Sequence, residues 1–288
     1  MQKSLLIICT MDYIKLHLTG ERALFKTDNA NIEECLFDDG ESPLKESKNF
    51  HVNKTTFGWK YPLWYSHDFD VKESTFLEMG RAGVWYSYHF KITKSEYGAP
   101  KGIRMCHDFA IEDTCFPLGE ETMWWNHDFV LSRVKAKGNY FAMRCQNATV
   151  DHLELEGNYA FDSCKNVVIS DSVLMTKDAF WNCENVTIRN CVIRGEYFGW
   201  NSKNITLINC KISSHQGFCY MENVTLIDCD LTDTDLSFEY CSNIDAKINS
   251  RVVSIKNPIS GKIVCQGVDE LILDDDEVNH DDTEIVVL

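Results

Sequence analysis

The chain has few basic residues and no long apolar run. Its 28 Lys and Arg are outnumbered by 44 Asp and Glu, which gives a formal net charge of −16. This charge argues against nucleic acid and anionic membranes as partners, because both bind basic surfaces. The one apolar run near the N-terminus, Leu5–Ile8, is far shorter than a signal-peptide core or a membrane span. We therefore expect a cytoplasmic protein without a membrane partner.

The chain contains a sequence repeat of about nineteen residues. Cys183–Cys191 returns as Ser202–Cys210 and again between Met221 and Cys229. One short polar position marks the phase at intervals of 19 to 21 residues, and it suits a side chain that bonds backbone in a tight turn. We interpret it as an asparagine ladder with these rungs: Asn29, Asn49, Asp68, His89, Asp108, Asp128, Asn147, Asn166, Asn185, Asn204, Asn223 and Asn243.

Each repeat alternates apolar and polar residues after the rung, as in Val186, Thr187 and Ile188, which is typical of a strand with one buried face. A second strand follows, and a third is expected near the aromatic run that closes the coil. Such short units bury their apolar faces only by stacking. The pattern predicts an all-β fold, a right-handed parallel β-helix (solenoid) of about twelve coils of 19–21 residues, capped at both ends. Leucine-rich repeats are disfavoured because their strand signature and any helical spacing are missing.

No linker rich in Pro, Gly or Ser interrupts the phase, so we expect one β-helix domain over residues 1–288. Residues 1–28 are predicted to form the N-terminal cap and residues 29–250 the coils. Residues 251–288 are predicted to hold coil remnants, a cap and an acidic tail. The acidic cluster lacks the glycine and oxygen spacing of a calcium loop, and so is expected to be solvated and to protect an edge: Asp274, Asp275, Asp276, Glu277, Asp281 and Asp282.

Several segments carry a family resemblance: Gly20–Phe25, Gly40–Ser47, Lys60–Tyr65, Gly138–Met143 and Gly195–Asn201. Over roughly residues 13 to 285 the chain resembles an uncharacterised bacterial family of single-domain right-handed parallel β-helix proteins. The resemblance implies a pectate-lyase-like fold. It implies no catalytic residues.

The thirteen cysteines fall on the repeat, mostly in two columns that Ser, Thr and Met fill elsewhere. We interpret them as small interior side chains of a reduced protein rather than as disulfides or zinc ligands. Neither a CxxC pair nor a His-x-His spacing is present. The sequence therefore predicts no metal and no cofactor.

Most tryptophans fall in one column of the third segment. If the preceding column, such as Leu63, Val84 and Phe161, points inward, strand alternation points the next one outward. That next column holds five of the seven tryptophans: Trp64, Trp85, Trp124, Trp181 and Trp200. Exposed rings suit stacking on sugar faces or a protein partner. Two alternatives remain open: loops could cover the rings, or an orientation shifted by one residue would bury them.

Beside this column runs a second one that contains Tyr140, Tyr159 and Tyr197 together with charged residues. A groove with aromatic rings, two carboxyl groups and cations is what a glycan-active enzyme needs. The candidate catalytic residues are the pair Asp162 and Asp178, then Glu196 and Glu121. The candidate cations for binding a uronate or an oxyanion are Arg81, Lys101, Arg104 and Arg144.

The sequence is compatible with three functions. The first is carbohydrate interaction, with glycan hydrolysis or elimination in a groove on the third sheet and an oligosaccharide as partner. The second is a non-catalytic binding module. The third is a structural β-helix whose aromatic residues form a homo-oligomer interface. Interruptions of the aromatic columns by Ala, Gly and Cys favour a shaped cleft, so carbohydrate interaction ranks first and catalysis stays undecided.

Overall fold

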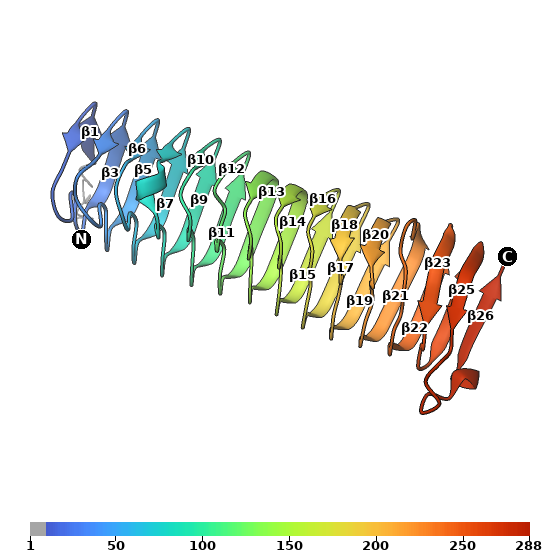
Figure 1. Cartoon of the computed structure of the whole chain (residues 1–288). Coiled ribbons are helices and arrows are strands. Elements are labelled where there is room, and N and C mark those ends of the chain that lie inside the picture. Colours follow the sequence, from blue (N-terminus) through green and yellow to red (C-terminus); the bar gives the residue numbers. More distant parts are fainter. Residues whose placement is uncertain (1–9) are drawn as a thin grey trace, which may run out of the picture.

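The computed structural model describes residues 10–288. One face of the rod is a row of paired strands that extends over its whole length (Figure 1). Each strand of this face pairs in parallel with the next. The strands are β1 (Met11–Ile14), β3 (Asp28–Glu33), β5 (Lys48–Asn53), β7 (His67–Lys72), β9 (Tyr88–Thr93), β11 (His107–Glu112), β13 (His127–Lys137), β14 (Gln146–Glu156), β15 (Lys165–Ser170), β17 (Glu184–Arg189), β19 (Lys203–Ile208), β21 (Glu222–Cys229), β22 (Ser242–Ile248), β24 (Gly261–Cys265) and β26 (Thr283–Val287).

Shorter strands form a second face: β2 (His17–Leu18), β4 (Leu36–Phe37), β6 (Thr56–Phe57), β8 (Thr75–Phe76), β10 (Glu96–Tyr97), β12 (Cys115–Phe116), the second halves of β13 and β14, β16 (Val173–Met175), β18 (Val192–Glu196) and β20 (Lys211–His215). Near the C-terminus β23 (Arg251–Lys256) and β25 (Gly267–Ile272) pair with each other. Two 3₁₀ turns, η1 (Glu78–Gly80) and η2 (His280–Asp282), are the helical elements of residues 10–288. No helix in that range is long and apolar enough to cross a membrane.

The predicted all-β, right-handed parallel β-helix is confirmed, but the predicted number of coils is wrong: the rod has about 15 turns. One additional coil precedes Asn29, because β1 pairs in register with β3. Two more follow residue 250, where β24 and β26 continue the first face. These coils lack the ladder residue, but they pair in register through the backbone and contribute apolar side chains such as Ile263 and Ile285 to the core. The acidic cluster therefore lies in the connection between β25 and β26, and Leu5–Ile8 lies outside the described residues.

The asparagine ladder is continuous from Asn147 to Asn243. Asn185 donates to the Oδ1 of Asn166 at 3.0 Å, and Asn204 donates to the Oδ1 of Asn185 at 2.8 Å. Each rung has a positive φ, 59° at Asn185, which asparagine tolerates better than most residues. This turn chemistry explains why the repeat prefers asparagine there.

The interior small polar columns bond to backbone. Ser87 Oγ donates to the carbonyl of Leu63 at 2.6 Å and accepts the amide of Ser66 at 3.0 Å. Cys164 takes the same position, and its Sγ accepts the amide of Cys145 at 3.3 Å. Burial raises the pKa of the Cys106 thiol to about 12. The described cysteines are all free, and all but Cys115 are buried, which confirms their prediction as interior side chains.

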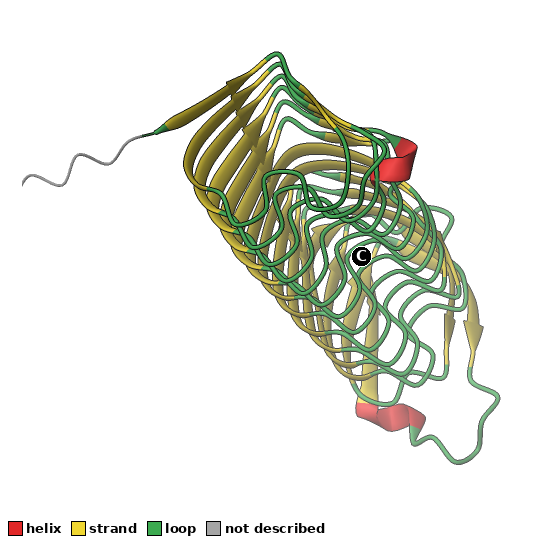
Figure 2. Ribbon diagram, turned by 90° about the vertical axis from the view of Figure 1, so that its left-hand side faces the viewer, coloured by secondary structure: helices red, strands yellow, loops and turns green. Residues whose placement is uncertain are grey.

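The third side of the coil is a series of turns rather than a regular strand, and Figure 2 shows loops where the first two faces show strands. Every second residue there has a positive φ, for example 64° at Tyr61, 62° at Leu63 and 56° at Tyr65. Strand alternation therefore fails. Pro62 and Leu63 are both buried, and the following Trp64 is half-buried.

Candidate functional site

Four tryptophans of the column each join their coil to the next one. The indole N–H of Trp85 donates to the carbonyl of Lys101 at 2.8 Å, and that of Trp181 donates to the carbonyl of Tyr197 at 2.8 Å. Trp64 and Trp124 make the equivalent bond to Ala82 and Tyr140. Arg104 replaces tryptophan in one coil and donates to the carbonyl of Glu121 at 2.7 Å. The accepting residues all lie in the flanking column. These bonds therefore connect neighbouring coils on the third side, and we call them the lacing; the lacing residues are Trp64, Trp85, Arg104, Trp124 and Trp181.

The lacing residues also stack on one another. The rings of Trp64 and Trp85 are 5.1 Å apart and 6° from parallel. The Arg104 guanidinium lies 5.2 Å from the ring of Trp85 and 4.2 Å from that of Trp124. Ring faces covered by neighbours are not available to a sugar. The expectation of free, outward-facing rings is therefore wrong for this part of the column, because the turns lay the indoles along the rod.

Most of the predicted cations are engaged within the protein. Arg104 is 8% exposed, and burial lowers its pKa while the neighbouring Glu121 opposes that shift. Glu121 Oε2 lies 3.0 Å from Arg104 Nη2 and 3.5 Å from Lys101 Nζ. The guanidinium of Arg144 lies 5.6 Å from the ring of Trp125. Arg81 contributes a backbone carbonyl to Tyr61. Uronate binding by Arg104 or Lys101 would require these pairs to break.

Within residues 10–288 the lacing is absent where Trp200, Cys219 and Glu239 stand in the tryptophan column, and it is also absent at two adjacent coils nearer the middle of the rod, where Met143 and Asp162 stand. Here the rings of Tyr140 and Tyr159 stack at 4.9 Å, and Trp181 meets Tyr159 edge-on at 6.2 Å. We call this patch the aromatic window and define it as Tyr140, Tyr159, Asp162, Asp178 and Trp181. It brings together five of the residues predicted from sequence.

The carboxylates in and beside the aromatic window differ in their surroundings. Asp162 Oδ1 accepts hydrogen bonds from Ser163 Oγ at 2.7 Å and Asn182 Nδ2 at 3.3 Å. Partial burial, reinforced by the charge of Glu196 and opposed by Lys177, raises the pKa of Asp178. Glu196 pairs with Lys177 at 2.7 Å. The pKa of Asp178 is thus shifted in the direction that a general acid requires. Glu121 lies elsewhere, in the pair with Arg104.

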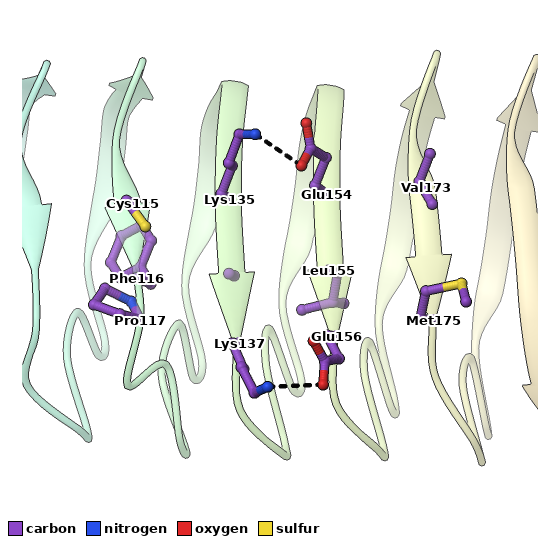
Figure 3. Close-up of a pocket in the computed structure, with 11 residues that line it drawn as sticks. Cys115, Phe116, Pro117, Lys135, Lys137, Glu154, Leu155, Glu156, Val173 and Met175 are labelled. Carbon is purple, nitrogen blue, oxygen red and sulfur yellow. Dashed lines mark ion pairs between the residues drawn. The ribbon is translucent and has the colours of Figure 1, made fainter.

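The hollows described next lie away from the predicted groove. Five surface hollows lie over the first two faces and their corners, and none of them is lined by the tryptophan column. Figure 3 shows one of about 410 Å³, in which Lys135 pairs with Glu154 and Lys137 with Glu156, each at 2.9 Å. This hollow was not predicted from the sequence, although Val173 and Met175 are apolar residues at outward strand positions and could have indicated it.

Glu154 and Glu156 lie on one face of β14. The rise per residue of a strand places them about 7 Å apart, a separation suited to acid–base chemistry on a sugar. Their side chains are 62% and 66% exposed and paired with lysines, however. Solvated ion pairs of this kind provide neither a desolvated acid nor a preorganised base. The hollow therefore offers a surface for contact rather than catalysis.

Within residues 10–288, no group of three or more His, Cys, Asp or Glu is arranged to hold a metal ion. The third side, by contrast, offers hydroxyl, carboxylate and ring groups in one place. These groups can hydrogen-bond and stack without a cofactor.

The sequence pattern of the family described as "Protein of unknown function (DUF3737)" matches residues 12–286. No curated protein matches the sequence. Among solved structures, PfbA, a surface adhesin of Streptococcus pneumoniae, is similar over 91% of this chain and 81% of that one, with 9% identity and a TM-score of 0.43. The AlgE4 A-module of the Azotobacter vinelandii mannuronan C-5 epimerase is similar over 96% and 87%, with 9% identity and a TM-score of 0.30. The catalytic domain of a GH87 alpha-1,3-glucanase in complex with nigerose is similar over 96% and 63%, with 8% identity and a TM-score of 0.37. At such low identities these likenesses carry no argument about what this chain binds.

Proposed function

The chain belongs to this family of proteins of unknown function, and we propose from its geometry that it binds a neutral glycan across the aromatic window. The observation that carries the proposal is the break in the lacing beside the stacked pair of Tyr140 and Tyr159. At that break no indole or guanidinium bridges the coils, so the outer edge of the tyrosine pair faces solvent. Tyr140 is 36% exposed.

The chemistry of the aromatic window suits sugar hydroxyls. Aromatic rings pack against the C–H faces of a sugar, and carboxylates accept its hydroxyl protons. Asp162 and Asp178 supply such acceptors on neighbouring coils. A uronate would meet these carboxylates and Glu196, while the nearest cation, Lys177, is already paired with Glu196. The aromatic window therefore favours neutral over acidic glycans, which argues against the elimination chemistry considered from the sequence.

The cytoplasmic location stays a prediction. If it holds, short oligosaccharides are the relevant probes, because polymers are largely extracellular. The experiment is a calorimetric titration with neutral gluco- and manno-oligosaccharides and with oligouronates. Tyr159→Ala is expected to weaken binding of the neutral sugar at least tenfold. The matched control is Tyr65→Ala, since Tyr65 and Tyr86 form a similar stacked pair at 4.8 Å where the lacing is intact.

Neutral-sugar binding that depends on Tyr159 and not on Tyr65 supports the proposal. Equal losses in both variants, preference for uronates, or no binding to any of the sugars would contradict it. If no sugar binds and the protein is dimeric in solution, an interface between copies becomes the better explanation of the exposed aromatic residues.

Glycoside hydrolysis is the second candidate, and the raised pKa of Asp178 is the observation in its favour. A general acid must hold its proton near the working pH. Asp178→Asn should then abolish release of reducing sugar while weakening binding less than Tyr159→Ala does. Turnover that survives this substitution would remove Asp178 as the acid.

A further inference from the structure

A column of aromatic and imidazole rings covers the outer surface of the first face far from the aromatic window. His67, Tyr88, His107 and His127 occupy the same strand position in four successive coils. Their rings stack nearly parallel, and the last two are 4.9 Å apart and 5° from parallel. The side chains of His107 and His127 are 36% and 49% exposed, so solvent reaches them.

Each of the three histidines is held by the aspartate that follows it in sequence. His107 Nδ1 lies 2.8 Å from Asp108 Oδ2, and His127 Nδ1 lies 2.7 Å from Asp128 Oδ2. A carboxylate accepts only from N–H, so the Nδ1 of each ring carries the proton. The Nε2 of each neutral ring is then a free lone pair. Within residues 10–288, Nε2 of His107 and His127 has no hydrogen-bond partner.

We infer that His107 and His127 together bind a divalent transition-metal ion through Nε2, with the remaining coordination positions open to water or another ligand. A carboxylate on the second ring nitrogen is the usual arrangement around a metal-bound histidine, because it fixes the tautomer and raises the basicity of the ligand. Imidazole nitrogens select Zn²⁺, Ni²⁺ or Cu²⁺ over Ca²⁺ or Mg²⁺. This inference is independent of the glycan proposal.

The spacing permits such a site once the two rings turn out of their stack. Metal–nitrogen bonds of about 2.1 Å join two nitrogens that are at most about 4.2 Å apart. The lone pair of each Nε2 lies in the plane of its ring, so the parallel rings, 4.9 Å apart, must turn toward each other until both lone pairs point at one ion. Both side chains are exposed, which leaves room for this rotation.

The sequence pattern did not reveal this pair, because no two histidines stand at a short metal-binding spacing in the chain. His107 and His127 are twenty residues apart and become neighbours only through the coil register. His67 is separated from them by Tyr88, so it does not complete a larger cluster.

The test uses the full chain and metal ions alone. Titration with Ni²⁺ or Zn²⁺ followed by calorimetry is expected to show one site that His107→Gln and His127→Gln each weaken at least tenfold. Asp128→Asn should weaken it about tenfold, because a carboxylate that bonds the second ring nitrogen of a metal-bound histidine typically contributes 10–100-fold to the affinity. The matched control is His152→Gln: His152 Nδ1 lies 2.7 Å from Asp151 in the same kind of pair but stacks on no second imidazole.

A second variant gains rather than loses a ligand. Tyr88→His would connect His67 to the pair and is expected to tighten Ni²⁺ binding several-fold, which no unfolding artefact can imitate. Cu²⁺ electron paramagnetic resonance should show coupling to two nitrogens in the wild type and to one in His127→Gln. Unchanged affinity in His107→Gln, an equal loss in His152→Gln, or no metal binding by the wild type would overturn the inference.

Discussion

The two halves of the rod, residues 28–137 and 146–248, build similar coils with aromatic residues in different places. In the N-terminal half the strands carry the rings: Phe90, Phe109 and Phe129 stack at 4.7 and 5.1 Å, while the third side carries Ile103 and Met123. In the C-terminal half the strands carry smaller residues such as Val167 and Val186, and phenylalanines fill the third side. They include Phe161 and Phe180, which stack at 5.1 Å.

The difference shows that large and small side chains exchange places between the first face and the third side from one half of the rod to the other. Protein interiors are close-packed, so a large side chain on one wall must face a smaller one on another. The outer surfaces of the two halves also differ. The N-terminal half has His–Asp pairs on the first face, and the C-terminal half has the uninterrupted asparagine ladder and Lys–Glu pairs.

The largest expected effect comes from removing a ring from the strand stack. Phe109→Ala leaves a cavity beside Phe90 and Phe129 and should lower the free energy of unfolding by about 3–5 kcal/mol. Val186→Ala, in the same column of the C-terminal half, should cost about 2 kcal/mol. Urea unfolding followed by circular dichroism measures both. Equal costs would contradict the comparison.

Volume exchange between walls can be tested directly in one coil. Phe129→Val with Met123→Phe imitates the combination of Val167 and Phe161 found in the C-terminal half. The double variant should be less destabilised than the sum of the single variants by about 1 kcal/mol or more. Strictly additive costs would show that the two walls do not exchange volume.

The ladder should matter more in the C-terminal half, where it is continuous. Asn185→Ala removes bonds to two neighbouring rungs and puts alanine at a positive φ, so it should cost about 2 kcal/mol. Asn185→Gly keeps the backbone conformation and should cost about half as much. Asp108→Ala in the N-terminal half should cost less than Asn185→Ala, because its partners are exposed histidines. The same unfolding experiment ranks the three.

Aspartates in the two halves should respond oppositely to pH. The hydrogen bond from His127, aided by Asn147, lowers the pKa of Asp128, whereas burial raises that of Asp178. Asp128 therefore stabilises the fold above its ordinary value of 3.8, and this contribution is lost as the pH falls through the lowered pKa. The contribution of Asp178 is present below 3.8 and is lost as the pH rises through its raised pKa.

The effect is small, and urea midpoints measured between pH 3 and 7 should show it. In Asp178→Asn, stability should fall less than in the wild type when the pH is raised. In Asp128→Asn, stability should fall less than in the wild type when the pH is lowered. Identical pH profiles in the two variants would show that these environments do not differ in solution.

The smallest effect is expected from the surface ion pairs of the C-terminal half. Glu184 pairs with Lys165 at 2.9 Å, and both side chains are about half exposed. Glu184→Gln should leave the urea midpoint almost unchanged, and 0.5 M salt should remove any difference from the wild type. A larger effect would mean that the charge ladder acts as a network.

Features of the molecule could be predicted where the residues that indicate them are neighbours in the sequence. Asn185, Val186 and Ile188 reveal rung and strand within a few residues, because turn chemistry and alternation act along the chain. The first and the last two coils were missed because they pair through backbone without a ladder residue. On the third side the residues of the aromatic window were found, but their surroundings depended on the sign of φ at positions such as Leu63, which residue type alone does not dictate.

The sequence by itself determined the repeat length, the parallel stacking of strands and the interior place of the cysteines, since each follows from a period that every coil repeats. The tertiary structure decided which aromatic rings are laced to the next coil, where the lacing stops, and which histidines become neighbours. Those features depend on the register between coils and on the path of the turns, and register brings together residues that stand about twenty positions apart.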